Sequence, residues 1–310
     1  MPLLMRKAVI LAKAETTYGV DPTPTGAANA ILVRNLSVTP NQQDLEDRKI
    51  IRAFLGGQEN IVAANHGEIS FEVELAGAGA AGTVPAYGPL LLACGMSATT
   101  SAGVSVTYAP VSTNFGSITL VCNIDGVNHK FTGSRGSASF QLNAKAVPVI
   151  QFKFTGLYNP VTDTAITGAT YAAFTKPVAV NKDNTTTATL FGTSLVLQSA
   201  AFDVNNSIVY RNLVGLETVQ LTDRECQGSI QFEAPTVTAF DIWSNIKNGT
   251  TGAMAITHGT TAGNIVQFSM PTVQVFSPQI SDSDGIAMLQ LSTKIIPTNA
   301  GNDEFSIVVR

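Results

Sequence analysis

The sequence predicts a mainly β protein, with a minor α component, built from two tandem antiparallel units that each carry one short helix. The first observation is a repeat. Residues 67–72 (GEISFE) return as residues 228–233 (GSIQFE), with the glycine, the isoleucine, the phenylalanine and the second acid in register. The second observation is that a short apolar segment and then several strand-like runs follow each copy. A period this long indicates two copies of a domain rather than a stack of solenoid units.

Each element of the first unit has its own signal. Residues 31–39 form a strand-like run that Pro40 is expected to stop. Residues 68–75 alternate apolar and polar side chains, as a half-buried strand requires. Residues 86–95 predict a short helix, in which Pro89 fits only the first turn. Glycine, asparagine and aspartate turns after these elements predict further antiparallel strands.

The second unit repeats this order. Residues 239–249 predict the matching helix, with Trp243 on its apolar side as a core residue. Residues 252–258 and 286–296 predict two strands, and the apolar end at residues 305–310 predicts a last strand docked on the sheet.

Four parts are therefore expected along the chain. The stretch 19–26, rich in glycine, proline and threonine, has little means of packing on itself, and residues 161–189 lack sustained periodicity, as a linker does. The parts are residues 1–30, an N-terminal assembly arm; 31–160, the first unit; 161–189, the linker; and 190–310, the second unit.

The composition favours a protein that assembles. Only 13% of the 310 residues are charged, so much of the surface is neutral and polar, which suits association. The net charge is −4, and no basic stripe for gripping nucleic acid is visible. The apolar run 8–12 is too short to cross a bilayer, so we expect a cytosolic product with no membrane partner.

The cysteines, histidines and paired acids give no constellation for chemistry. Three cysteines without metal-type spacing are expected to be buried apolar residues in a reducing compartment; they are Cys94, Cys122 and Cys226. His66, His129 and His258 have no partner at metal or triad spacing. We therefore expect no enzyme activity, no metal and no cofactor. A hydrolase with an unrecognised site stays an alternative.

Three short motifs resemble the major tail tube proteins of long-tailed phages with non-contractile, siphovirus-type tails. They are residues 14–22 (AETTYGVDP), 30–36 (AILVRNL) and 86–95 (AYGPLLLACG), in that order within roughly the first third of the chain. The resemblance implies β-sandwich or barrel-like units, each flanked by one helix, that self-assemble into stacked rings. Such rings form the tube through which DNA passes during genome ejection. A non-catalytic carbohydrate-binding or adhesive β-sandwich protein is the alternative, although only 7% of the residues are aromatic.

The resemblance also implies a location and partners. The protein would be made in the host cytoplasm and incorporated into the virion tail. Its partners would be the tape measure, tail terminator and distal tail proteins, and double-stranded DNA would pass without specific binding. This chain departs from the family by carrying the tail-tube-like unit twice. Closed symmetry then favours a homotrimeric ring with pseudo-six-fold symmetry, and a hexameric ring with the second unit outside is the alternative.

Three groups of candidate site residues follow. The acids of the repeated strands are expected to line an electronegative channel along which DNA slides without being held, unless they form only a solvated outer face; they are Glu72, Glu74 and Glu233. Apolar residues of the arm and of the long connection 41–67, which a monomer would leave partly exposed, are expected to contact the next ring; they are Val9, Ile10, Leu11, Ile50, Ile51 and Phe54. The matched core positions of the repeat are Ile69, Phe71, Ile230 and Phe232.

Overall fold

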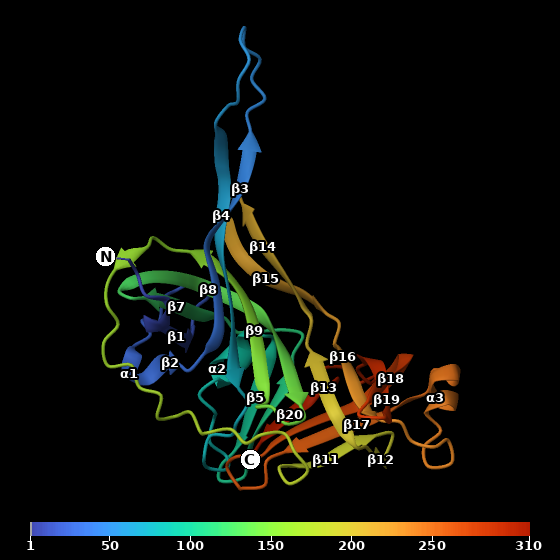
Figure 1. Cartoon of the computed structure of the whole chain (residues 1–310). Coiled ribbons are helices and arrows are strands. Elements are labelled where there is room, and N and C mark those ends of the chain that lie inside the picture. Colours follow the sequence, from blue (N-terminus) through green and yellow to red (C-terminus); the bar gives the residue numbers. More distant parts are fainter. Residues whose placement is uncertain (1) are drawn as a thin grey trace.

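The computed structural model describes residues 2–310, which form an antiparallel β protein with three short α-helices (Figure 1). The predicted mainly β class is confirmed. One continuous sheet contains eight strands that follow one another edge to edge across both halves of the chain. In spatial order, these wall strands are β3 (Arg34–Asp47), β4 (Asn60–Glu74), β9 (Val149–Tyr158), β8 (Val127–Asn143), β13 (Leu197–Asp203), β16 (Gln227–Glu233), β19 (Ile286–Ile295) and β18 (Val266–Ser283).

Further strands extend each half of this wall, where the first half is formed by β3, β4, β9 and β8 and the second half by β13, β16, β19 and β18. In the first half, β7 (Ile118–Ile124) pairs with β8 and with β1 (Ala8–Ala14), and β1 also pairs with β2 (Ala30–Ile31). In the second half, β17 (Thr251–His258) pairs with β18 and with β11 (Thr185–Leu190), which also pairs with β12 (Thr193–Ser194). The order β3–β4–β9–β8–β7–β1–β2 therefore has the same pattern as β13–β16–β19–β18–β17–β11–β12.

The remaining elements connect or decorate the two halves. β5 (Met96–Ser101) and β6 (Ser105–Pro110) form a hairpin in the first half of the sequence. The C-terminal strand β20 (Ser306–Val309) pairs with both β6 and β18, which confirms the predicted docked strand. The smaller elements are η1 (Met5–Lys7), α1 (Gly26–Asn29), β10 (Thr162–Asp163), and a separate two-stranded hairpin of β14 (Asn206–Leu213) and β15 (Leu216–Arg224).

The hydrophobic core runs through both halves. Each wall strand turns one set of alternate side chains inward, because successive residues of a strand face opposite sides. In the first half Phe71 lies with its ring centroid 5.9 Å from Phe152 and 6.1 Å from Phe154. The three cysteines are buried and free, as predicted.

The two predicted helices are present as α2 (Gly88–Ala93) and α3 (Ile242–Asn248). Asp241 caps α3 by accepting a bond from the Ser244 amide, and Gly249 ends it at a φ of 63°, which favours glycine. The expectation of a core Trp243 is wrong. Ile242 is the buried residue at this end, and the next position along a helix turns about 100° away, which leaves Trp243 exposed.

Pro40 does not stop the first strand, contrary to expectation. β3 continues through it to Asp47 and forms one long hairpin with β4. The outer edge of β3 has no partner strand in residues 2–310, so the missing proline N–H costs no ladder bond there. Pro40 lies inside a register shift between Thr39 and Gln42, which is where an irregular residue is tolerated.

The N-terminal segment is part of the first half rather than a separate arm around residues 8–14. β1 pairs with strands on both edges, and Ile10 and Leu11 are buried. Glu15 fixes the end of β1, because its carboxylate accepts bonds from the Ser117 and Thr119 hydroxyls at 2.6 and 2.7 Å. Residues 8–14 of the predicted arm therefore pack within their own chain.

Candidate assembly surfaces

The two halves meet at a sheet junction between β8 and β13, which we call the closed junction. Residues Ser139–Asn143 pair with Ser199–Asp203 in antiparallel register. Phe140 lies opposite Phe202, and their rings stack with centroids 5.3 Å apart. The Val204 amide also donates to the Ala138 carbonyl at 3.0 Å. Side chains on the inner side of the closed junction are fully buried.

The two outer edges of the wall have no such cover. At one end, β18 beyond Val275 pairs only with β19, and Phe276 and Ile280 are exposed. At the other end, the outer edge of β3 over residues 34–39 is unpaired in the part of the chain that is described. Both edges present backbone groups that a further strand could bind.

The residue pairing along the strands shows that the two open edges correspond to the two strand edges that meet at the closed junction. Ile69 lies between Phe154 and Val38, as Ile230 lies between Leu291 and Ala200, so Val38 occupies the position of Ala200.

The same comparison applies to the other edge. Phe152 pairs with Ala138, and its counterpart Leu289 pairs with Ile280. Ala138 is 0% exposed, whereas Ile280 is 66% exposed. The open edge of β18 therefore has the position of the β8 edge without its covering strand.

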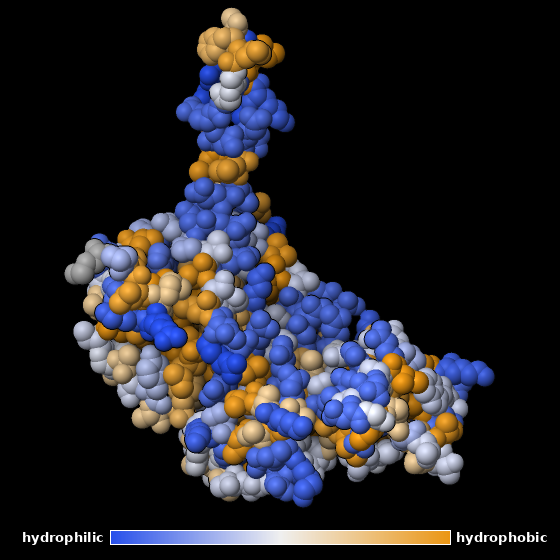
Figure 2. Space-filling view, in the orientation of Figure 1, coloured by the Kyte–Doolittle hydropathy of each residue, from blue (hydrophilic) through white to orange (hydrophobic). Residues whose placement is uncertain are grey.

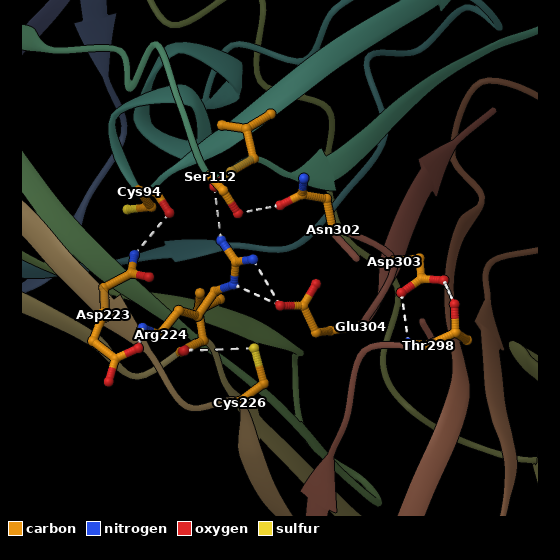
Figure 3. A network of polar contacts seen from close by, with 12 residues as sticks. Cys94, Ser112, Asp223, Arg224, Cys226, Thr298, Asn302, Asp303 and Glu304 are labelled. Atoms are coloured by element: carbon orange, nitrogen blue, oxygen red, sulfur yellow. Dashed lines mark hydrogen bonds and ion pairs between the residues drawn. The ribbon is translucent and has the colours of Figure 1, made fainter. Parts of the chain in front are cut away.

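A buried ion pair ties the C-terminal segment to the rest of the molecule (Figure 3). The Arg224 guanidinium lies 2.7 Å from the Glu304 carboxylate, and both side chains are about nine-tenths buried. Arg224 also donates to the Val111 carbonyl at 3.0 Å, and Ser112 donates to Asn302 at 2.5 Å. These contacts bridge residues of the first half, of β15 and of the C-terminal segment.

The β14–β15 hairpin also leans on the first half. The Val219 amide donates to the Tyr18 hydroxyl at 2.6 Å, and Arg135 donates to the Val219 carbonyl at 2.9 Å. Tyr210 donates to the Asn65 carbonyl at 3.0 Å, so the short hairpin is held against the base of the long one. The two hairpins lie side by side in Figure 1.

The long β3–β4 hairpin projects from the body and ends in an apolar tip (Figures 1 and 2). Residues 48–59 join its strands without a helix. Ile51 is 96% exposed and Phe54 is 69% exposed, and Ile50 and Leu55 are exposed as well. Monomeric proteins rarely leave such a cluster uncovered, so the tip is a candidate contact surface.

The structure places the other predicted ring-contact residues differently. Val9 is half-buried, and Ile10 and Leu11 are buried inside their own chain. The expectation that a monomer leaves them exposed is wrong, because β1 packs between β2 and β7. Of the six predicted residues, the exposed ones are Ile50, Ile51 and Phe54.

The predicted channel acids lie on the face of the wall opposite the core. Glu72 and Glu233 alternate with the buried Phe71 and Phe232 on β4 and β16, and Glu74 ends β4. Arg34 partly neutralises Glu72, because its guanidinium lies 3.2 Å from the carboxylate, and Asn35 donates a hydrogen bond to the same carboxylate at 2.8 Å. The same face also carries serine, glutamine and threonine side chains and two lysines, Lys153 and Lys294, which form ion pairs with Glu68 and Glu225.

The predicted core positions lie where the wall strands face inward. Ile69, Phe71, Ile230 and Phe232 are each at most 2% exposed. The sequence analysis missed the open β18 edge and the Arg224–Glu304 pair. In the sequence, Ile280 lies in a polar run, which gives no sign that its side chain stands at an open strand edge. The ion pair joins residues far apart in the sequence, so no local pattern predicts it.

The histidines do not converge on a site. His66 lies on β4, His129 on β8 and His258 on β17, and residues 2–310 contain no group of three or more potential metal ligands. Within the same residues, no helix is long and apolar enough to span a membrane.

The chain was compared with families of known proteins. A family model described as phage tail tube protein matches residues 5–298, which is nearly the whole chain. No curated protein matches the sequence.

Proposed function

The chain belongs to the phage tail tube protein family, and from this premise we propose that it self-assembles into stacked rings that form the DNA conduit of a non-contractile tail. Membership of this family supports a structural role in the virion, and we propose no enzymatic activity. The tape measure, tail terminator and distal tail proteins are its proposed partners.

The two open edges support a ring of three chains. The closed junction joins two halves with the same strand order, which favours tandem tail-tube-like units at about residues 31–160 and 190–310. In the ring, β18 of one chain would pair with β3 of the next, as β8 pairs with β13 within the chain. Both open edges of the wall are then paired, and three chains give six similar units. A ring of six whole chains would require a different role for the second half of each chain.

The face opposite the core would line the channel. Its acids, Glu72, Glu74 and Glu233, would repel phosphate. Its two lysines, Lys153 and Lys294, lie beside Glu68 and Glu225, and its neutral hydroxyl and amide groups add little counterion-release affinity. Glu233 has no ion pair within residues 2–310, so it provides a cleaner probe than Glu72. We expect Glu233→Lys to leave tubes intact and to slow genome delivery. Normal delivery through assembled variant tails would instead favour a solvated outer face for these acids.

Contacts between rings would come from the hairpin tip. β3 and β4 are wall strands that continue past the body, so their tip extends beyond one rim of the ring toward its neighbour (Figure 1). Ile50, Ile51 and Phe54 would then bury their exposed side chains on the next ring.

Negative-stain microscopy of purified protein tests the proposal. Wild type should form tubes with an axial hole. The double variant I51D/F54D should form single rings only, because each charge would have to be buried without a partner. Val104→Asp provides the control, since Val104 is exposed on a turn away from the tip. Wild-type protein that forms neither rings nor tubes under any assembly condition would contradict the proposed function.

A further inference from the structure

We propose that the hairpin tip inserts into an alanine-lined cavity on a chain of the next ring. The proposal rests on the stacked rings described above and names the surface that receives the tip. The tip side chains concerned are Ile50, Ile51, Phe54 and Leu55, which are all exposed. The receiving surface, which we call the alanine cavity, is formed by β1, α1, β2, the start of α2 and the linker segment 170–173.

The alanine cavity is apolar, and its rim is open to solvent. Its volume is about 290 Å³, and seven of its eleven lining residues are alanines. Four of these alanines are exposed: Ala27, Ala28, Ala172 and Ala173. None of the described lining residues is charged. Such a lining has no partner for a charged ligand and suits apolar side chains.

Close packing between α1 and the linker fixes one wall of the alanine cavity. The Thr170 amide donates to the Gly26 carbonyl at 3.2 Å. A Cβ atom on Gly26 would lie 2.7 Å from the Thr167 carbonyl oxygen, so glycine permits this approach. The Thr25 amide donates to the Asn29 side chain at 3.0 Å, which closes the short helix on itself. The cavity is therefore part of the folded monomer.

The hairpin tip and the alanine cavity lie at opposite ends of the same two strands. Ala30 and Ile31 line the cavity and immediately precede β3, so the cavity lies at the Arg34 end of that strand. The 14 residues of β3 span roughly 40 Å from this end toward the tip. β4 returns from the tip to Glu74, and the chain then enters α2, whose first turn also lines the cavity. In Figure 1, α1 and α2 lie in the body, and the tip projects away from them.

This placement suits the stacking of rings into a tube. A contact between opposite ends of identical subunits repeats without closing on itself. One such contact per chain therefore gives rings that all point the same way along the tube. Tips that met each other would instead give a closed pair of rings, which could not extend.

The tip also matches the cavity in size and polarity. Phe54 is 69% exposed, and Ile51 and Leu55 are almost completely exposed. A dry apolar cavity of about 150 Å³ holds a benzene molecule. At about 290 Å³, the alanine cavity has room for the Phe54 ring and one aliphatic side chain of the tip. Insertion would remove both side chains from water, which favours stacking.

The second half has a cavity at the corresponding position, but its lining is polar. That cavity lies between β12 and α3, which correspond to β2 and α2. Its volume is about 660 Å³, and its lining includes Asp241, Ser244 and Asn245. An apolar tip gains less there, because it would cover polar groups that otherwise bond to water. The test therefore has to separate the alanine cavity from this second-half cavity.

Cross-linking probes the contact directly. We expect the double variant A53C/A28C, treated with a short bis-maleimide after assembly, to give a ladder of more than three chains on a denaturing gel. Links from tip to cavity continue from ring to ring, whereas links within a ring of three would stop at three chains. The native cysteines are buried, and burial raises the pKa of Cys122 and of Cys226 to about 12, which keeps both thiols protonated and unreactive.

Three variants serve as controls for the cross-link. They are A53C alone, A28C alone and A53C/S244C, and all three substituted positions are exposed in the monomer. None of these variants should give the ladder. A ladder from A53C/S244C, or A53C/A28C tubes that give only single chains on the gel, would overturn the proposal.

Ala28→Trp tests the energetic role, because the indole would fill the alanine cavity. It should raise the protein concentration needed for tube formation at least tenfold, and it should leave single rings and the thermal midpoint of the monomer unchanged. Ser244→Trp, in the second-half cavity, is the matched control and should change none of these quantities. Tubes that form from the Ala28→Trp variant as they do from wild type would refute the alanine cavity alone. Absence of both rings and tubes from wild type would instead refute the proposed function.

Discussion

In the proposed ring, the closed junction and the open edges are the same structural feature, formed once within the chain and once between chains. At the closed junction, Phe140 and Phe202 are buried because the chain supplies both strands. At the open edge, Ile280 stands exposed at the position of Ala138, since the strand that would cover it belongs to a neighbour in our account. In this account, each chain supplies both strands of the closed junction, and a neighbouring chain has to supply the second strand of the other junction.

The largest expected effect concerns the closed junction. Phe140→Ala should lower the free energy of unfolding by about 3–5 kcal/mol, because the ring is buried and contacts Phe202 and Phe268. Urea denaturation of unassembled protein measures the change. A loss below about 1 kcal/mol would mean that the two halves do not depend on this contact.

The buried ion pair should be the next largest contribution. Glu304→Leu alone leaves Arg224 without its carboxylate and should cost about 3 kcal/mol, because an unpaired buried charge is strongly unfavourable. The double variant R224M/E304L should recover most of that loss. If the double variant is as unstable as Glu304→Leu, packing around Glu304 rather than the ion pair explains the effect.

A substitution at the open edge of β18 should affect assembly rather than the stability of the monomer. Ile280→Asp should change the stability of the monomer by less than about 0.5 kcal/mol, because the side chain is exposed. The same change should abolish ring formation, since the position becomes buried in the ring. Calorimetry and size-exclusion chromatography check the two effects separately. Intact rings from this variant would break the proposed equivalence of the two junctions.

A smaller effect is expected from pH. Burial holds the pKa of His258 below its usual value, although the Val178 carbonyl 3.1 Å from its ring opposes this shift. The unfolded chain therefore takes up a proton at a higher pH than the folded one, and stability falls as pH drops below about 6.5.

Because His258 also contacts Thr185 at 3.0 Å, the loss would loosen the segment before β11, in which the Val180 amide donates to the Ala146 carbonyl of the first half. His258→Gln should flatten the stability profile between about pH 5 and pH 7. Equal profiles for wild type and variant would show that another group titrates.

Local sequence signals predicted local structure well. The alternating run at residues 68–75 and the helix start at Pro89 correspond to β4 and α2. The prediction that Pro40 ends the strand was wrong because a proline disrupts a strand only where its missing N–H would have bonded to a neighbouring strand. The prediction of a buried Trp243 was wrong because the sequence alone does not show which side of the helix packs against the sheet.

The assembly surfaces depended on long-range information. The repeat of residues 67–72 and 228–233 predicted two comparable strands, but not which strand edges the chain would leave open. Ile10 and Ile51 are both isoleucines in segments predicted to contact another ring, yet one is buried in β1 and the other stands on a hairpin tip. Only pairing in three dimensions separates them.

A reconstruction of the assembled tube by electron cryo-microscopy tests the central claim most directly. We expect three chains per ring, six similar lobes about the channel, and β18 of each chain paired with β3 of the next. Six whole chains per ring, or a β18 edge that faces solvent in the assembled tube, would contradict it.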